Sequence, residues 1–479
     1  MSDASDSRTF DIADQPPPKK QKKSEYEWYD RAYAKASKYW DDPPEDDPTS
    51  VIAATLEDKF LHAARPFACT GTIDMVGALE KVKVYYTGPD GEASVNLPLN
   101  TADADALHAA GQLSMFGRDG GNVYDESYRL AREHRPPQVA ISADPVLVGD
   151  ILPFVRQHLG IDRPLRAVLY KVNTYSAGGF FGAHRDTPKG TDHIGTITVC
   201  LPSEFEGGEL VVRHGGKEVK SEWSSQVRPT ADKPARLGWM FLYSDCDHEV
   251  LPVTSGTRVT LAYDVFASQG MEGEQVKYSD AAELTDALRA AYQNLDFLPD
   301  GGHIAFAMQH SYPHTRCDEL ADEALVKEFK GGDMVWLRAV QDAQLDWRLL
   351  GVYSDSMEDD PKSYETDAEP YRFKGRDLPA QEGFMYLQDA LFGSDYCPNP
   401  KWFFDNKDVA WITLPICWGG RNSYMSYGNE WCAEATYVNV ALVAKIPTAE
   451  EREAALNGGV VVEKATPEPK QDNDEEQQE

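Results

Sequence analysis

A glycine-rich turn leads into a short strand at Gly178-Gly-Phe-Phe-Gly-Ala-His-Arg-Asp186, and the fold and function follow from this stretch. Side chains at positions i and i+2 of a strand point to the same face, so His184 and Asp186 can address one point in space. Of the eleven histidines in the chain, only His184 has a carboxylate two positions further on. The pair predicts two ligands of one metal site.

A third candidate ligand, His248, comes shortly after the hydrophobic strand predicted over Leu237–Tyr243. Two imidazoles and one carboxylate on neighbouring strands are typical of a facial triad that leaves open coordination positions. Structural zinc sites are closed by four ligands, and zinc does no redox chemistry. The donor set His184, Asp186 and His248 therefore favours an oxygen-activating Fe(II) centre.

An arginine follows the third candidate ligand in the segment Thr254-Ser-Gly-Thr-Arg258-Val-Thr260. Gly256 allows the chain to turn between the two strands. An arginine buried inside a small β structure needs a carboxylate partner, and the guanidinium group matches a carboxylate with two parallel hydrogen bonds. Thr260 shares the face of Arg258 and offers a hydroxyl group. The segment predicts a site for a carboxylate ligand.

These residues resemble, in order and spacing, the iron(II)- and 2-oxoglutarate-dependent dioxygenases, with the closest likeness to the prolyl 4-hydroxylase-like superfamily. The resemblance also includes Tyr175-Ser-Ala-Gly178 before the first ligand and the turn Gly207-Gly-Glu-Leu210. It covers residues 165–266. One departure is Phe181, where many members carry a tyrosine three residues before the first histidine. Tyr175 is the candidate to compensate for that missing hydroxyl group.

The resemblance implies a double-stranded β-helix, or jelly-roll, as the catalytic core. It also implies Fe(II) as the metal, and 2-oxoglutarate and O₂ as cosubstrates. Arg258 would bind the far carboxylate of 2-oxoglutarate, with Thr260 and Tyr175 as further candidates to contact it. The substrate would be hydroxylated or oxidatively demethylated with release of succinate and CO₂, and a protein side chain is the first hypothesis for it. Two alternatives are a catalytically silent regulatory or binding protein on the same fold and a small-molecule oxygenase.

The order of predicted elements indicates an α+β protein. Seven short β segments between residues 165 and 266 predict a sandwich or barrel. We expect a dioxygenase domain over residues 51–268, with its core at 165–266, and a C-terminal α/β domain over 269–462 with candidate strands at Gly301–Met308 and Tyr437–Ile446. Asp144 caps a predicted helix that runs to Gly160 and flanks the core. Residues 1–50 and 463–479 are predicted to be disordered tails, the second of them acidic.

Composition restricts the partners. The chain of 479 residues has 79 acidic against 47 basic residues and a formal net charge of −32, so a nucleic acid partner is not expected. We expect no membrane insertion, because no apolar run is long enough to span a bilayer.

The seven cysteines form no CxxC pair, which indicates a reducing compartment. The cluster Pro16-Pro-Pro-Lys-Lys-Gln-Lys-Lys23 resembles a nuclear import signal, so we predict a nuclear or cytoplasmic protein. The oligomeric state is left open.

Three further motifs carry weaker hypotheses. His310 and His314 could hold a metal, but Pro313 argues against the helix that would align them, so a structural or surface role is favoured. The glycine-rich segment Phe116–Gly121 is equally consistent with a lid and with an ordinary surface loop. Tyr427-Gly-Asn-Glu430 together with Tyr437 resembles a motif, but no chemistry is assigned to it.

Overall fold

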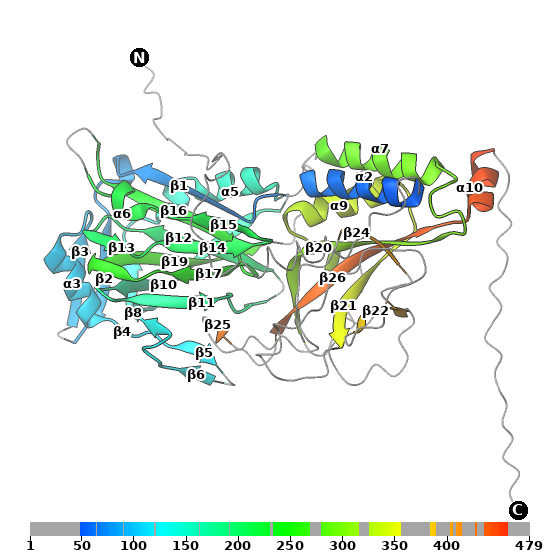
Figure 1. Cartoon of the computed structure of the whole chain (residues 1–479). Helices are drawn as coiled ribbons and strands as arrows, with labels where there is room; N and C mark the ends of the chain where they lie inside the picture. Colours follow the sequence, from blue (N-terminus) through cyan, green and yellow to red (C-terminus); the bar gives the residue numbers. More distant parts are fainter. Residues whose placement is uncertain are drawn as a thin grey trace, which may run out of the picture.

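The protein is described by a computed structural model over residues 48–268, except positions 64, 90, 119–120, 162, 191 and 230–232. It further describes residues 279–315, 325–355, 384–388, 403–405, 409–413, 427–428 and 435–457. The basic cluster and both expected tails lie outside these ranges, apart from residues 48–50. Figure 1 shows two halves side by side, with β strands dominating the first half and a sheet covered by helices in the second.

The first half is built on a large antiparallel sheet of seven strands. Its spatial order is β1-β16-β12-β19-β10-β8-β4. The strands are β1 (Ala68–Asp74), β16 (Arg236–Tyr243), β12 (His193–Cys200), β19 (Arg258–Ala267), β10 (Leu165–Tyr175), β8 (Arg132–His134) and β4 (Gln112–Leu113). Neighbours in this sheet come from distant parts of the sequence, so the sheet can form only when the whole half is folded.

A second antiparallel sheet has five strands in the order β15-β14-β17-β11-β7. These are β15 (Lys217–Lys220), β14 (Leu210–His214), β17 (Asp247–Val250), β11 (Phe180–His184) and β7 (Arg129–Leu130). Both sheets contribute to one hydrophobic cluster, in which Val199 and Phe241 of the large sheet join Val212 and Phe181 of the small one. All seven predicted β segments are strands here, and together the two sheets form the jelly-roll core.

Short elements surround the jelly-roll core. They are η1 (Gly77–Leu79), β2 (Lys83–Gly88), β3 (Gly91–Asn96), α3 (Thr101–Ala110), β5 (Phe116–Arg118), β6 (Gly121–Val123), β9 (Val139–Ile141), β13 (Phe205–Gly207), α6 (Trp223–Gln226) and β18 (Val253–Gly256). The single flanking helix expected up to Gly160 is wrong. Two helices, α4 (Pro145–Val148) and α5 (Ile151–Leu159), stand there because Asp150 has a positive φ of 52°, which interrupts the helical backbone.

The second half contains a six-stranded sheet, called here the C-terminal sheet, in the order β23-β22-β21-β26-β20-β24. Its strands are β20 (Gly302–Thr315), β21 (Trp347–Asp355), β22 (Phe384–Gln388), β23 (Phe403–Asp405), β24 (Ala410–Thr413) and β26 (Ala435–Ile446). The strands predicted over Gly301–Met308 and Tyr437–Ile446 are parts of β20 and β26. One parallel pair, β20 with β24, makes the sheet mixed.

Helices α2 (Pro48–His62), α7 (Ser279–Gln293) and α9 (Gly331–Asp342) lie over one face of the C-terminal sheet, with α10 (Ala449–Leu456) at its end (Figure 1). Phe60 of α2 stacks on Phe306 of β20 at 4.4 Å between ring centroids. Helix α2 therefore belongs to the core of the C-terminal half, although the sequence connects it directly to the first strand of the jelly-roll core. The proposed boundary near residue 51 runs through this helix.

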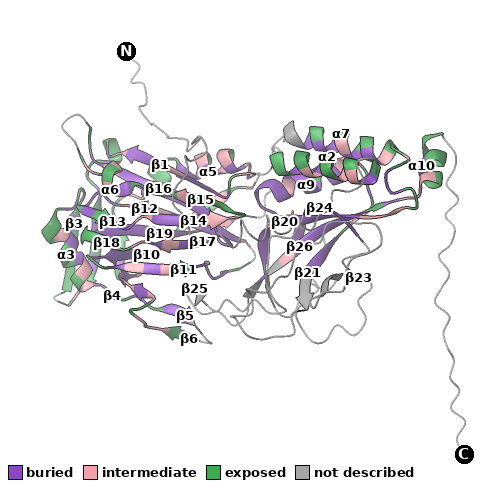
Figure 2. Cartoon of the chain, in the orientation of Figure 1, coloured by how far each residue is buried: buried purple, intermediate pink, exposed green. Residues whose placement is uncertain are grey.

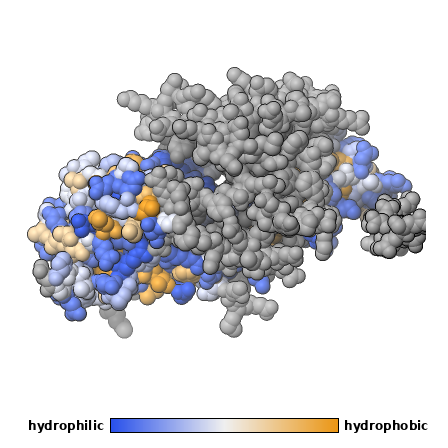
Figure 3. All heavy atoms as spheres, turned by 90° about the horizontal axis from the view of Figure 1, so that it is seen from below, coloured by the Kyte–Doolittle hydropathy of each residue, from blue (hydrophilic) through white to orange (hydrophobic). Residues whose placement is uncertain are grey.

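Burial separates the interior from the surface in both halves. Figure 2 shows buried residues along the central strands of both halves and exposed residues on the outer faces of α2, α7 and α10. On the face seen in Figure 3, hydrophilic residues predominate over the described part of the first half, and apolar residues form only small separate patches. None of the described helices is long and apolar enough to cross a membrane.

Candidate metal centre

The three predicted ligands converge in the structure. His184 ends β11, His248 lies on the neighbouring strand β17, and these two residues are direct partners in the antiparallel register. Asp186 follows two residues after β11. The ligand atoms of the three side chains all lie within 4.8 Å of one another, and all three residues are buried. The strand spacing that motivated the prediction thus brings the two imidazoles and the carboxylate to one point.

Both imidazoles are oriented by backbone carbonyl groups. His184 Nδ1 lies 2.9 Å from the Gly182 carbonyl oxygen, and His248 Nδ1 lies 3.0 Å from the Cys246 carbonyl oxygen. A carbonyl oxygen only accepts, so each Nδ1 carries the hydrogen and each Nε2 keeps a lone pair. Burial, with the neighbouring His248 acting in the same direction, lowers the pKa of His184 well below its ordinary value. A neutral imidazole with a free Nε2 is the form that binds a metal.

The carboxylate of Asp186 is held from two sides. The hydroxyl group of Thr196 on β12 donates to Oδ2 at 2.5 Å, and Oδ1 lies 3.7 Å from His248 Nε2. The backbone N–H of Asp186 donates to the Ser244 carbonyl oxygen at 3.2 Å. One carboxylate oxygen is therefore anchored to the large sheet, while the other faces the imidazole of His248. Thr196 was not among the sequence candidates, because a strand threonine carries no distinguishing signal.

Aromatic rings support the first imidazole. Phe181 stacks on His184 with 3.7 Å between ring centroids, and Tyr128 lies at 6.0 Å from Phe181 in an edge-on arrangement. The Tyr128 hydroxyl group donates to the carbonyl oxygen of Ala183, the residue before His184. A tyrosine hydroxyl from a different segment thus reaches the ligand strand where Phe181 has none. Sequence reasoning missed Tyr128 because it lies outside the resemblance.

The predicted carboxylate-binding arginine is buried inside the jelly-roll core. Arg258 begins β19 with 1% of its surface exposed. Its guanidinium carbon lies 5.3 Å from the ring centroid of Tyr175 and 5.4 Å from that of Trp223. Among the described residues, its Nε and Nη2 atoms have no hydrogen-bond partner. Leaving such donors buried and unpaired is costly, so the arginine is poised for an anionic group that comes from outside the chain.

Glycines make room for this arginine. A Cβ atom on Gly208 would lie 2.8 Å from Arg258 Cδ, and one on Gly256 would lie 2.0 Å from the Glu204 carbonyl oxygen. Both glycines also have φ near +69°, a region that suits glycine. Close packing therefore explains both glycine turns quoted from the sequence, against Arg258 at Gly208 and against the Glu204 backbone at Gly256.

The two remaining cosubstrate candidates, Tyr175 and Thr260, are buried beside Arg258. Tyr175 is the direct partner of Arg258 in the register of β10 and β19, and Thr260 is opposite Asn173 in the same pair of strands. Tyr175 is 3% exposed and Thr260 is 1% exposed. Their position next to the unpaired guanidinium group agrees with the expectation, and their contact with a cosubstrate stays a prediction.

A comparison with known protein families finds a match over the residues that form this candidate centre. The model of the 2OG-Fe(II) oxygenase superfamily matches residues 170–263, which contain all three candidate ligands and Arg258. These residues belong to the 2OG-Fe(II) oxygenase superfamily. The oxygenase domain makes the chain an oxidoreductase whose cofactors are Fe(II), 2-oxoglutarate and O₂. The donor set agrees, since two neutral imidazoles and one carboxylate suit Fe(II) and the unpaired guanidinium group suits a dianion.

Solved structures similar to the chain include three prolyl hydroxylases. A prolyl-4-hydroxylase from Pseudomonas putida is 21% identical over 30% of this chain and 72% of its own, with a TM-score of 0.21. A prolyl hydroxylase from Trichoplax adhaerens, solved with a hypoxia inducible factor peptide fragment, is 18% identical over 34% and 74%, with a TM-score of 0.25. A collagen prolyl hydroxylase from Paramecium Bursaria Chlorella virus-1 is 15% identical over 42% and 96%, with a TM-score of 0.23. No curated protein sequence matches the chain.

A buried group of charges lies beside the candidate metal centre of the oxygenase domain. Glu133 on β8 accepts from Lys171 at 3.2 Å, from Arg135 at 2.6 Å and from Arg129 at 3.5 Å. Burial alone would raise the pKa of Glu133, but the three cations outweigh it and lower this pKa to about 2. Arg129 also donates to Asn173 at 3.2 Å, and its guanidinium carbon lies 4.2 Å from the Phe181 ring centroid. The group connects the ligand-supporting ring to the large sheet.

A second set of two histidines and one carboxylate lies where the halves meet. His214, Asp245 and His310 also place their ligand atoms within 4.8 Å of one another. His310 Nδ1 lies 3.0 Å from Asp245 Oδ2, which agrees with the structural role expected for His310. The side chain of His314 lies outside the described residues.

The glycine-rich segment that was a lid candidate forms the hairpin of β5 and β6. The short strand β25 (Tyr427–Gly428) pairs with β5 and so connects this hairpin to the C-terminal half. Phe116 is fully buried and lies 4.6 Å from Tyr128 between ring centroids. The hairpin is therefore anchored by a ring and by an added strand, and the lid role remains a hypothesis.

Proposed function

We propose that His184, Asp186 and His248 hold the Fe(II) of the oxygenase domain, and that Arg258 binds the far carboxylate of 2-oxoglutarate. The observation that supports this proposal most strongly is the arginine: its guanidinium group is almost fully buried, and two of its nitrogen atoms have no hydrogen-bond partner in the described part of the chain. A buried cation without a partner is destabilising, and a dicarboxylate would supply the missing charge and hydrogen bonds.

Each residue then has a defined task. The iron and its two cosubstrates supply the oxidant that breaks a substrate C–H bond, with succinate and CO₂ released. The carbonyl groups of Gly182 and Cys246 fix the ring orientation of the two histidines, and Thr196 fixes that of Asp186. Outer partners of this kind keep ligands in the geometry that the metal requires. The aromatic rings of Tyr175 and Trp223 surround the arginine and keep water from its guanidinium group.

A protein side chain is the substrate class that we propose, hydroxylated at a C–H bond. The support is the resemblance of the segment around His184, Asp186 and His248 to prolyl 4-hydroxylase-like enzymes. We further propose that residues 269–462, together with the helix α2 that packs on them, form a C-terminal domain that supports the oxygenase domain. We also propose that the basic cluster Lys19–Lys23 directs the chain to the nucleus.

The experiment that tests the cosubstrate assignment compares Arg258→Ala and Arg258→Lys with the wild type. Hydrogen bonds to charged groups contribute about 1.5–3 kcal/mol, so Arg258→Ala should raise the 2-oxoglutarate concentration for half-maximal succinate formation by roughly tenfold or more. Lysine keeps the charge but loses the paired geometry and should fall between the two. Iron binding should stay unchanged, because the arginine is no ligand. An unmoved 2-oxoglutarate dependence in Arg258→Ala would make the arginine structural and refute the assignment.

A further inference from the structure

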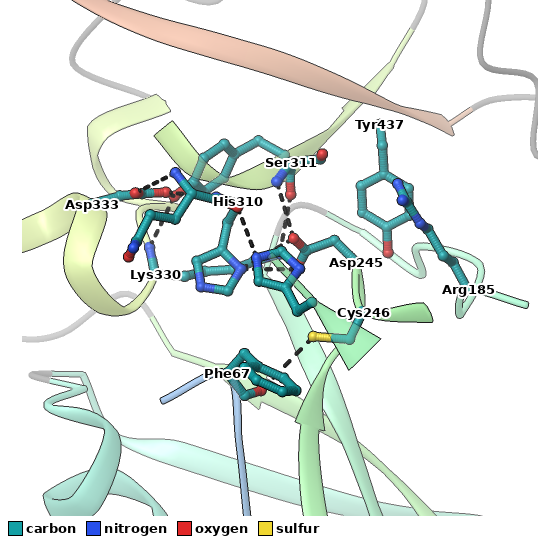
Figure 4. A network of polar contacts seen from close by, with 12 residues as sticks. Phe67, Arg185, Asp245, Cys246, His310, Ser311, Lys330, Asp333 and Tyr437 are labelled. Carbon is teal, nitrogen blue, oxygen red and sulfur yellow. Dashed lines mark hydrogen bonds and ion pairs between the residues drawn. The ribbon is translucent and has the colours of Figure 1, made fainter. Parts of the chain in front are cut away.

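The halves meet at a buried ionic network centred on Asp245. This carboxylate, which is three residues before His248, accepts three hydrogen bonds from the C-terminal half. Lys330 Nζ lies 2.9 Å from Oδ1, and His310 Nδ1 and the Ser311 backbone N–H each lie 3.0 Å from Oδ2. Figure 4 shows His310, Ser311 and Lys330 converging on Asp245 from the second half. None of these four residues is more than 4% exposed.

The network is ionic, and the lysine supplies its cation. Burial would raise the pKa of Asp245, but Lys330 and His310 outweigh it and hold this pKa well below its ordinary value. The ammonium group already contacts the carboxylate, and His214 Nε2 bonds the Gln309 carbonyl oxygen at 2.7 Å. A metal at the set His214, Asp245 and His310 would have to displace both the lysine and the hydrogen bond from His310. The set is therefore a structural junction.

A second contact reaches the ligand Asp186 itself. Tyr437 on β26 is buried, and its hydroxyl group donates to the Asp186 carbonyl oxygen at 3.0 Å. The N–H of Asp186 donates to the carbonyl oxygen of Ser244, the residue before Asp245. The backbone of this ligand is thus bonded on one side to the segment that the ionic network fixes and on the other side to the C-terminal sheet.

We propose that Tyr437, Lys330 and Asp245 are positioning residues, through which the C-terminal half orients the metal ligands Asp186 and His248. This inference rests on the proposed function, because it takes these two residues as ligands. Tyr437 acts on the backbone of Asp186, and the ion pair of Lys330 with Asp245 acts on the segment that leads into His248. The C-terminal half thereby completes the metal centre without contributing a ligand.

The test uses the full chain, the variant Tyr437→Phe and the matched control Thr413→Val. Thr413 is also a buried residue of the C-terminal sheet, but its hydroxyl group donates to the carbonyl oxygen of Ala307, within the same sheet, at 3.2 Å. Mn²⁺ affinity is titrated without cosubstrates, and stability is measured by urea unfolding. Outer partners of metal ligands typically contribute 10–100-fold to affinity, so Tyr437→Phe should weaken Mn²⁺ binding by about tenfold. Thr413→Val should lower the urea midpoint and leave Mn²⁺ affinity unchanged.

Two outcomes would overturn the inference: a wild-type Mn²⁺ affinity in Tyr437→Phe, or an equal loss of affinity in Thr413→Val. The variant His184→Gln, His248→Gln separates this failure from failure of the proposed function. If that variant loses Mn²⁺ binding while Tyr437→Phe does not, the ligands are correct and the positioning role is wrong. If that variant binds Mn²⁺ like the wild type, the ligand assignment fails first.

Discussion

Two sets of the same composition, each with two histidines and one aspartate, lie in different regions of this chain. In the oxygenase domain, His184 and His248 bond carbonyl groups through Nδ1, so that each Nε2 atom keeps its lone pair. At the junction of the halves, the carboxylate of Asp245 is already occupied by Lys330 and His310. The difference teaches that donor type and spacing do not define a metal centre. What the neighbours leave unpaired decides whether a ligand can bind.

The largest expected effect concerns the set at the junction of the halves, in which the Asp245 carboxylate is paired with Lys330. Lys330→Met would leave Asp245 buried without its cation, and breaking a buried pair in this way typically costs 3–5 kcal/mol. We expect the free energy of unfolding to fall by about that amount in urea. In the double variant Asp245→Asn, Lys330→Met most of the loss should be recovered, because no charge stays unpaired.

An exposed ion pair in the same half gives the matched control. Arg338 and Asp342 form an i,i+4 pair on α9, with side chains 45% and 43% exposed. Arg338→Met should cost less than about 1 kcal/mol. If Lys330→Met were no more destabilising than this control, the junction would not be a buried ionic network, and the contrast between the two sets would be lost.

The contrast also explains what could be predicted from sequence. The candidate ligands His184 and Asp186 are two residues apart, at the end of β11 and just after it, so local spacing brings them together. Local patterns also predict the seven strands of the jelly-roll core. Tyr437 is 251 residues from Asp186 along the chain. A contact of that kind depends on how the two halves dock, and no local pattern encodes it.

Two errors within the fold have the same origin. The break between α4 and α5 depends on the positive φ of Asp150, which amphipathic spacing does not reveal. Helix α2 packs on the C-terminal half because Phe60 contacts Phe306 of the C-terminal sheet and Trp336 of α9, at 4.4 and 5.6 Å between ring centroids. Its position in the sequence suggested the other half. A single residue's backbone conformation decided the first and long-range packing decided the second, and the local hydrophobic pattern reveals neither.

The charges around Glu133 provide a second buried ionic group to compare with the one at Asp245, and this one lies entirely inside the oxygenase domain. The folded pKa is lowered from 4.5 to about 2, so the stabilisation is fully present above pH 4.5 and is lost as pH falls towards 2. A shift of this size corresponds to about 3 kcal/mol. Wild type should therefore exceed Glu133→Gln in urea stability above pH 4.5, and the gap should shrink below it. A gap that does not change with pH would show that Glu133 is not held ionised by its neighbours.

The central claim, that the set His184, Asp186 and His248 holds iron and the set His214, Asp245 and His310 does not, is tested most directly by metal content. The same double substitution is made in each set: His184→Gln, His248→Gln in one variant and His214→Gln, His310→Gln in the other. Each purified, folded protein is loaded with Fe(II) without oxygen, and bound iron per chain is determined by elemental analysis. We predict one iron per chain in the wild type and in the His214, His310 variant, and none in the His184, His248 variant. Iron retained in the His184, His248 variant, or lost from the folded His214, His310 variant, would contradict the account.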